Sequence, residues 1–337
     1  MTNTRRAACL LGACVLINAS PLYAQTRVVF AGAAYQSKPI LAPVVFLVSS
    51  RNEDREWAIG VTGWTLGADA KQALAPTWKR HLFVRFTPIH AHASSTIFVD
   101  GVRDRSAEFS DAAVELGGGF EVAHHKGWTG AYRLVATYDA VSGLRDPSQK
   151  RFWRHPFIGV DVSERYQRVT SDDVFRPRWE GFKAEAAFRV LTGTATWSQL
   201  RMSAGAGRRA GPSFFTVNAS AFAGHSLNTA SAFLIGGSWD VSSPDVLPGY
   251  HYAEFRVTRG ATILGGVDVR VRGPWEVGVR SGVLCREAAA VSGTAIQMTT
   301  VWRGALFSAG AAFPHRPPAQ GNRVHLFATI GAAIVRP

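Results

Sequence analysis

The chain has 337 residues, of which 47% are hydrophobic and 18% are charged, with a mean hydropathy of +0.02. This composition excludes a disordered protein, and the lack of any run of roughly 18 uninterrupted apolar residues excludes a bundle of membrane helices. The 33 glycines and 11% aromatic residues favour β-structure with tight turns, and the formal charge of 37 − 24 = +13 indicates acidic partners.

The N-terminal segment predicts export. Arg5 and Arg6 precede an apolar run, and residues 22–24 end in a small residue, so we expect a signal peptide at 1–24. A lipoprotein cleavage site before Cys14 is the alternative. An exported domain argues against nucleic acid as the acidic partner. Only Cys285 follows this segment, so we expect no intramolecular disulfide and interpret Cys285 as a packing residue.

Segments with alternating apolar and polar residues run through the rest of the chain. In chain order they are 40–49, 55–66, 79–89, 94–103, 110–123, 128–141, 153–164, 179–191, 194–206, 213–224, 263–283, 296–313 and 322–335. The short connections between them are 51–54, 124–127, 191–193 and 273–274, and the longer ones are 67–78, 142–152, 226–252 and 314–321. Alternation of short and long connections is typical of outer-membrane barrels. We therefore expect one all-β domain at 25–337, a transmembrane antiparallel β-barrel of about 12–16 strands.

The segment at 263–283 has the clearest period of two. Val267 and Val269 alternate with charged residues, and after Gly273 the pattern resumes at Trp275. In a soluble sandwich the charged face would meet water, whereas in a barrel it would line the lumen. The glycine- and charge-rich face of 115–121 would be a poor sandwich core. The predicted lumen charges are Asp268, Arg270, Arg272, Glu276 and Arg280, which indicate either an anion-favouring lumen or an internal network of ion pairs.

Catalytic and metal motifs are weak. The stretch 224–228 reads GHSLN and lacks the last glycine of G-x-S-x-G, and neighbours such as His225 and Ser226 point to opposite faces of a strand. His90 and His92 share a strand face, but no carboxylate or thiol is spaced to complete a metal site. We therefore expect no enzyme activity, no catalytic residues, no metal and no cofactor.

The C-terminal part resembles a known family on several successive motifs. These are FLIGGSWDVSSPDVLPGYHYAEFRVTRG from Phe233, then ATILGGVDVRV, WEVGVRSGVL and SAGAAFPHRPPAQGNRVHLFATIGAAIV. Their order, over about 213–335, resembles the barrel of the Omp85 family, also called the bacterial surface antigen (D15) type. The resemblance implies a large loop that folds into the lumen. That predicted loop site consists of Gly236, Gly237, Leu247, Pro248, Gly249 and Tyr250.

Three features differ from the family pattern. Pro248 stands where the family has an arginine that acidic groups inside the barrel hold in place. The predicted strands begin almost directly after residue 24, which leaves no room for the periplasmic POTRA domains that receive client proteins. Residues 334–337 lack the terminal aromatic residue that barrel assembly machinery reads.

The sequence therefore predicts an outer-membrane barrel without POTRA domains, with a structural, transport or assembly-related role. Its expected partners are outer-membrane lipid and lipopolysaccharide, together with anionic solutes or client proteins. Two alternatives stay open at this point: a passive anion-preferring pore unrelated to the family, and a lipid-modifying outer-membrane enzyme.

Overall fold

The computed structural model describes residues 28–36, 40–51, 55–62, 65–87, 98–99, 102–104, 110–142, 155–173, 178–227, 231–237, 246–251, 254–287, 289–303, 305–316 and 323–334. The predicted signal peptide at 1–24, as well as His90 and His92, lies outside these residues. Among the described residues no helix is both long and apolar enough to cross a membrane.

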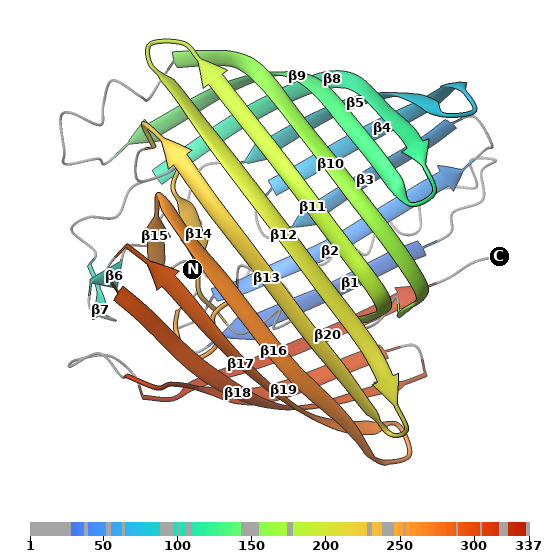
Figure 1. The fold of residues 1–337 in the computed structure, drawn as a ribbon, viewed down its shortest axis with the longest axis vertical. Helices are drawn as coiled ribbons and strands as arrows, with labels where there is room; N and C mark the ends of the chain where they lie inside the picture. Colours follow the sequence, from blue (N-terminus) through green and yellow to red (C-terminus); the bar gives the residue numbers. More distant parts are fainter. Residues whose placement is uncertain are drawn as a thin grey trace, which may run out of the picture.

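One closed antiparallel barrel dominates the structure (Figure 1). Its sixteen strands are β1 (Val28–Gln36), β2 (Ile40–Arg51), β3 (Arg55–Thr62), β4 (Thr65–Ala75), β5 (Trp78–Thr87), β8 (Ser110–His125), β9 (Trp128–Ser142), β10 (His155–Asp173), β11 (Arg178–Thr192), β12 (Thr196–Ala210), β13 (Ser213–His225), β16 (Arg259–Arg272), β17 (Trp275–Arg286), β18 (Ala289–Trp302), β19 (Ala305–Pro314) and β20 (His325–Ile334). Each strand pairs with the next in this order, and β1 closes the ring by pairing with β20. The predicted all-β barrel of 12–16 strands is confirmed.

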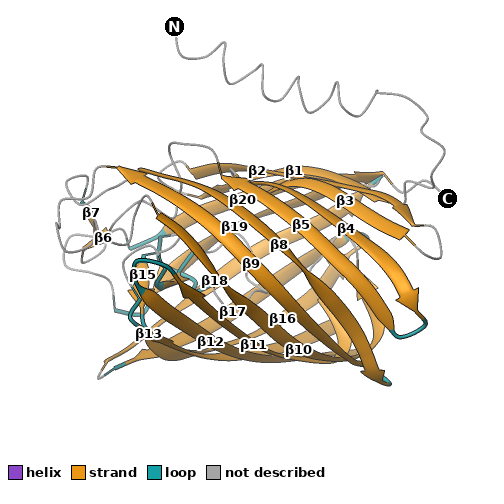
Figure 2. Ribbon diagram, turned by 90° about the horizontal axis from the view of Figure 1, so that it is seen from above, coloured by secondary structure: helices purple, strands orange, loops and turns teal. Residues whose placement is uncertain are grey.

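Two small hairpins lie outside the ring of strands. One pairs β6 (Phe98–Val99) with β7 (Val102–Arg103), and the other pairs β14 (Phe233–Ile235) with β15 (Phe255–Val257). Figure 2 shows both hairpins at the same end of the barrel. The predicted strand at 94–103 is therefore wrong as a barrel strand, because its described part forms this separate short hairpin.

The period of two in the sequence becomes an inside and an outside. In β17 burial alternates residue by residue: Trp275, Val277 and Val279 are exposed, whereas Glu276 and Arg280 are buried. The exposed face is therefore apolar and the buried face is polar, the reverse of a soluble sandwich. This is the arrangement of a barrel with lipid outside and a polar lumen.

The two ends of the barrel differ. Tight turns at 76–77, 126–127, 211–212 and 273–274 lie at one end, which we call the short-turn end. The opposite, long-loop end carries the connections across 88–109, 143–154 and 226–258. Two predicted connections are corrected: 67–78 is mostly β4, whose small and polar residues hide its alternation, and the short connection after Leu191 lies at the long-loop end.

Candidate functional site in the barrel lumen

The described residues of the connection between β13 and β16, which we call the lumen segment (residues 226–258), pack against the inner wall. A buried apolar cluster joins its residues to two inward-facing wall residues, Phe222 of β13 and Leu284 of β17. The members from the lumen segment are Ile235, Leu247, Tyr250, Phe255 and Val257. Burying each large side chain of this kind stabilises the docked segment by roughly 1.5–3 kcal/mol.

A pair of glycines forms the slot into which the tip of the lumen segment, residues 247–250, fits. Gly282 of β17 and Gly293 of β18 are buried and directly opposite each other in the ladder. A Cβ atom on Gly293 would lie 1.9 Å from the Pro248 carbonyl oxygen, and one on Gly282 would lie 3.2 Å from Pro248 Cδ. The wall must lack side chains here because the backbone of the tip occupies that space.

The next two residues explain why the tip holds its shape. Gly249 has φ = +84°, and a Cβ there would lie 2.3 Å from the backbone carbon of Phe313. Only glycine tolerates both conditions. The Tyr250 hydroxyl donates to the Ser292 carbonyl at 3.3 Å, and its ring meets Phe255 edge-on at a centroid distance of 4.9 Å.

The predicted glycine pair lies next to the same tip. Gly236 and Gly237 are buried and have φ values of +134° and +99°. Gly237 also forms an isolated antiparallel bridge with Leu247. The structure therefore brings all six predicted loop residues together, and Pro248 packs against the wall glycines Gly282 and Gly293.

The predicted lumen charges divide into three groups. Arg280 of β17 donates to the Asp268 carboxylate of β16, and both side chains are almost fully buried. Glu276 is buried on the same inner face, and Arg270 stands opposite it near the turn, where it is exposed. Arg272 does not face the lumen: a bulge between Arg270 and Arg272 places it opposite Trp275, on the outward face.

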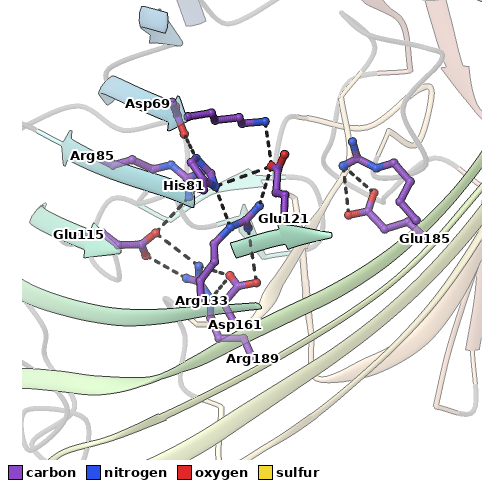
Figure 3. A network of polar contacts seen from close by, with 11 residues as sticks. Asp69, His81, Arg85, Glu115, Glu121, Arg133, Asp161, Glu185 and Arg189 are labelled. Atoms are coloured by element: carbon purple, nitrogen blue, oxygen red, sulfur yellow. Dashed lines mark hydrogen bonds and ion pairs between the residues drawn. The ribbon is translucent and has the colours of Figure 1, made fainter. Parts of the chain in front are cut away.

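A second polar network covers the inner wall on the far half of the ring, from β4 to β11 (Figure 3). His81 Nε2 lies 2.9 Å from Asp69 Oδ1, and Arg133 Nε donates to His81 Nδ1 at 3.1 Å. Because Nδ1 accepts, the ring proton is on Nε2 and points at Asp69. Lys71 Nζ lies 2.8 Å from Glu121. The imidazole therefore links β4, β5 and β9.

The network continues as a chain of ion pairs. Arg189 of β11 lies 2.7 Å from Asp161 of β10 and 2.9 Å from Glu115 of β8, and Glu115 also accepts from Arg85 of β5 at 3.1 Å. Arg133 reaches toward Asp161 at 3.8 Å. No short sequence motif identifies this network, because its members come from six strands. In the sequence the network is visible as charged residues at alternate positions of these strands, which face inward.

The network is balanced in charge. Its cations are Lys71, Arg85, Arg133 and Arg189, and its carboxylates are Asp69, Glu115, Glu121 and Asp161. Four positive charges thus meet four negative charges. The paired groups of this network therefore add no net charge to the lumen.

One carboxyl group beside the docked tip has a shifted pKa. Burial raises the pKa of Glu254 to about 7, although the Glu254 side chain accepts from the His251 backbone N–H at 2.7 Å, and Arg286 also lowers the pKa. Neighbouring His251 is buried edge-on against His325 of β20, with ring centroids 4.4 Å apart. The tip therefore contacts β17, β18, β19 and β20. No group of three or more His, Cys, Asp or Glu residues suited to a metal ion occurs among the described residues.

Comparison with solved structures identifies the fold. BamA from Haemophilus ducreyi lacking POTRA domains 1–3 matches with a TM-score of 0.67, 8% identity, and coverage of 92% of this chain and 70% of that one. CdiB from Acinetobacter baumannii matches with a TM-score of 0.61 and 8% identity, over 92% of this chain and 60% of that one. CdiB from Escherichia coli matches with a TM-score of 0.54 and 10% identity, over 94% of this chain and 64% of that one. This chain thus spans less than two thirds of either CdiB chain. No family model and no curated protein sequence matches. The chain therefore has the same fold as the BamA and CdiB barrels.

Proposed function

We propose that the protein is an outer-membrane barrel with a transport or assembly role, in which the lumen segment acts as an internal gate. The observation that carries this proposal is the docking of residues 247–250 in the slot formed by Gly282 and Gly293. The segment lies between the eleventh and twelfth barrel strands, β13 and β16, and contacts the wall from β13 to β20. It therefore occupies the half of the lumen opposite the charge-balanced network.

The proposed passenger of the barrel is a client protein. The family resemblance implies client proteins, and a polar wall that carries balanced, mutually satisfied charges suits a passenger of mixed charge. A passive anion-preferring pore is less well supported, because the charges of the network cancel. We also propose that residues 1–24 are a cleaved signal peptide and that 25–337 form one barrel domain, which N-terminal sequencing of the mature protein would test.

Single-channel conductance in planar bilayers tests the gate. We expect low conductance from the intact protein and a clear increase after deletion of residues 240–249, because the deletion removes most of the docked tip. The matched control is Gly265→Ala on the outer face of β16, where a new Cβ would approach nothing closer than the Thr216 carbonyl oxygen at 3.9 Å. Unchanged conductance in the deletion variant, with a correctly folded barrel, would overturn the gate.

A further inference from the structure

The outer face of the short-turn end carries arginines that point toward lipid. Three of them are exposed and stand directly opposite an aromatic residue on the neighbouring strand: Arg80 opposite Phe120, Arg168 opposite Phe182, and Arg208 opposite Phe215. Their partners are among the exposed large hydrophobic residues of the outer face. Because residues opposite each other share a face, these arginines extend the lipid-facing surface past its apolar part.

Aromatic rings mark the depth of this surface. The Trp78 ring meets the Phe120 ring edge-on with a centroid distance of 5.9 Å. The centroid of the Tyr166 ring lies 5.1 Å from that of Trp128 and 6.1 Å from that of Phe182. Tryptophan and tyrosine gather where the hydrocarbon core of a bilayer meets the headgroups. The arginines beside them therefore lie at headgroup level.

Two more arginines at this end lie beside a tryptophan. Arg272 stands opposite Trp275 beyond the bulge in β16, and the Arg303 guanidinium lies 4.7 Å above the Trp302 ring. Arg55 is exposed on the same face, opposite Gln72 of β4. This belt thus includes six arginines: Arg55, Arg80, Arg168, Arg208, Arg272 and Arg303.

Carboxylates do not neutralise the belt. On the same part of the outer face the described residues include two, Glu164 and Glu180. Glu164 is already engaged, because it accepts from the Tyr132 hydroxyl and lies 3.3 Å from His124 Nε2. Six cations against two carboxylates leave an excess of four positive charges on the outer face at the short-turn end.

The chemistry of this belt fits phosphate. An arginine on the lipid face is costly at the bilayer midplane and nearly free of cost at the interface, so the belt is stable only beside headgroups. The guanidinium fork binds phosphate oxygens in pairs, and its flat face stacks on aromatic rings. Facing outward in line with the lipid-facing valines and leucines, these side chains are placed for lipid and not for a ligand in the lumen.

The opposite end of the barrel carries hydroxyl and imidazole groups on its outer face, together with exposed Arg259 of β16. There Thr294 Oγ1 lies 2.8 Å from both Ser281 Oγ and His315 Nε2, and Ser292 Oγ lies 3.0 Å from His315 Nδ1. Short turns face the periplasm in outer-membrane barrels, where the leaflet consists of phospholipid. We propose that the arginine belt binds the phosphate groups of anionic phospholipids in the periplasmic leaflet and thereby fixes the height of the barrel in the membrane.

Lipid selectivity of the reconstituted full chain tests this proposal. The protein is placed in phosphatidylcholine vesicles that contain traces of spin-labelled phosphatidylglycerol or phosphatidylcholine, and the immobilised fraction of each label gives their relative affinities. We expect a preference for phosphatidylglycerol of roughly tenfold that weakens as salt rises from 50 to 500 mM. The combined change Arg80→Gln, Arg168→Gln and Arg208→Gln should lower it at least threefold.

The matched control removes the same charge elsewhere. Arg259, Arg316 and Arg323 are exposed cations at the long-loop end, and their combined change to Gln should leave the preference unaltered. Heat-dependent gel mobility verifies that each variant is folded, and if the belt variant does not fold, the salt dependence of the wild type decides. Equal losses in both variants, a salt-independent preference, or no preference would overturn the proposal. Binding of polyglutamate without any lipid preference would also overturn it, in favour of an acidic protein partner.

Discussion

The glycine slot makes a sharp prediction for Gly293→Ala. The new methyl group would lie 1.9 Å from the Pro248 carbonyl oxygen and 2.9 Å from the Phe313 carbonyl oxygen. Neither is the end of a flexible side chain, so the tip of the lumen segment has to leave the slot. The approach to the Phe313 carbonyl oxygen also requires a small shift of β19, and we expect the ladders of β18 with β17 and β19 to persist.

The size of the effect follows from what the tip buries. Leu247 is fully buried and Tyr250 is 3% exposed, so each contributes roughly 1.5–3 kcal/mol to docking. The hydrogen bond from Tyr250 to the Ser292 carbonyl adds about 1 kcal/mol. Loss of even half of this total, about 3 kcal/mol, shifts the ratio of docked to undocked segment by roughly a hundredfold.

Limited proteolysis with chymotrypsin measures that ratio, because Tyr250 and Phe255 are cleavage sites only when the segment is released. We expect Gly293→Ala in detergent micelles to be cut in the segment at least tenfold faster than wild type. Gly265→Ala is the control, since it makes the same change in a strand where a Cβ meets no close neighbour. Equal cleavage rates for the two variants, with both barrels folded, would refute the slot.

Three further predictions concern charge. Arg280→Gln removes the cation that pairs with the buried Asp268 carboxylate and should lower the free energy of unfolding by denaturant by about 3–5 kcal/mol. Adding Asp268→Asn should restore part of this loss, and strictly additive losses would contradict the pair. Because the docked segment raises the pKa of Glu254 from 4.5 to about 7, docking should weaken as pH rises from about 4.5 to 7, by at most about 3.4 kcal/mol, and stay constant above. Cleavage rates measured against Glu254→Gln at each pH check this, and a parallel pH profile in both would contradict it. Val269→Arg puts a charge in lipid and should lower the stability of the folded barrel by about 2–4 kcal/mol, whereas Arg270→Ala should have a smaller effect. The folded fraction is read from heat-dependent gel mobility, and equal effects of the two changes would contradict the assignment of faces.

The sequence predicts the two faces of a strand best where that strand alternates clearly by itself. In β17, Val277 and Val279 alternate with Glu276 and Arg280 without interruption, so the two faces can be assigned from the sequence alone. In β4 the outward positions include Ala70 and Gln72, and the pattern is too weak to distinguish a strand from a loop. Small outward residues suffice there because the neighbouring strands supply the larger apolar groups.

The errors in the predicted site come from features that period-two reasoning cannot represent. A bulge adds one residue and turns Arg272 to the opposite face, although the sequence around it continues to alternate. The slot depends on Gly282 and Gly293 being opposite each other in the ladder, which only the register of β17 on β18 decides. The network around His81 requires the order of six strands, and a local motif search contains no information on that order.

Closure of the ring has a consequence for how the chain folds. The seam pairs residues near the two ends of the chain, from Val29 with Ile334 to Gln36 with Phe327. Bringing together ends separated by about 300 residues costs roughly 2.5 kcal/mol more chain entropy than closing a hairpin of about 15 residues. The other barrel pairings join strands that are consecutive in the ring and close shorter spans of chain. The seam is thus expected to form last, and until β20 arrives the growing sheet presents β1 as an unpaired edge that must be shielded from other exported chains.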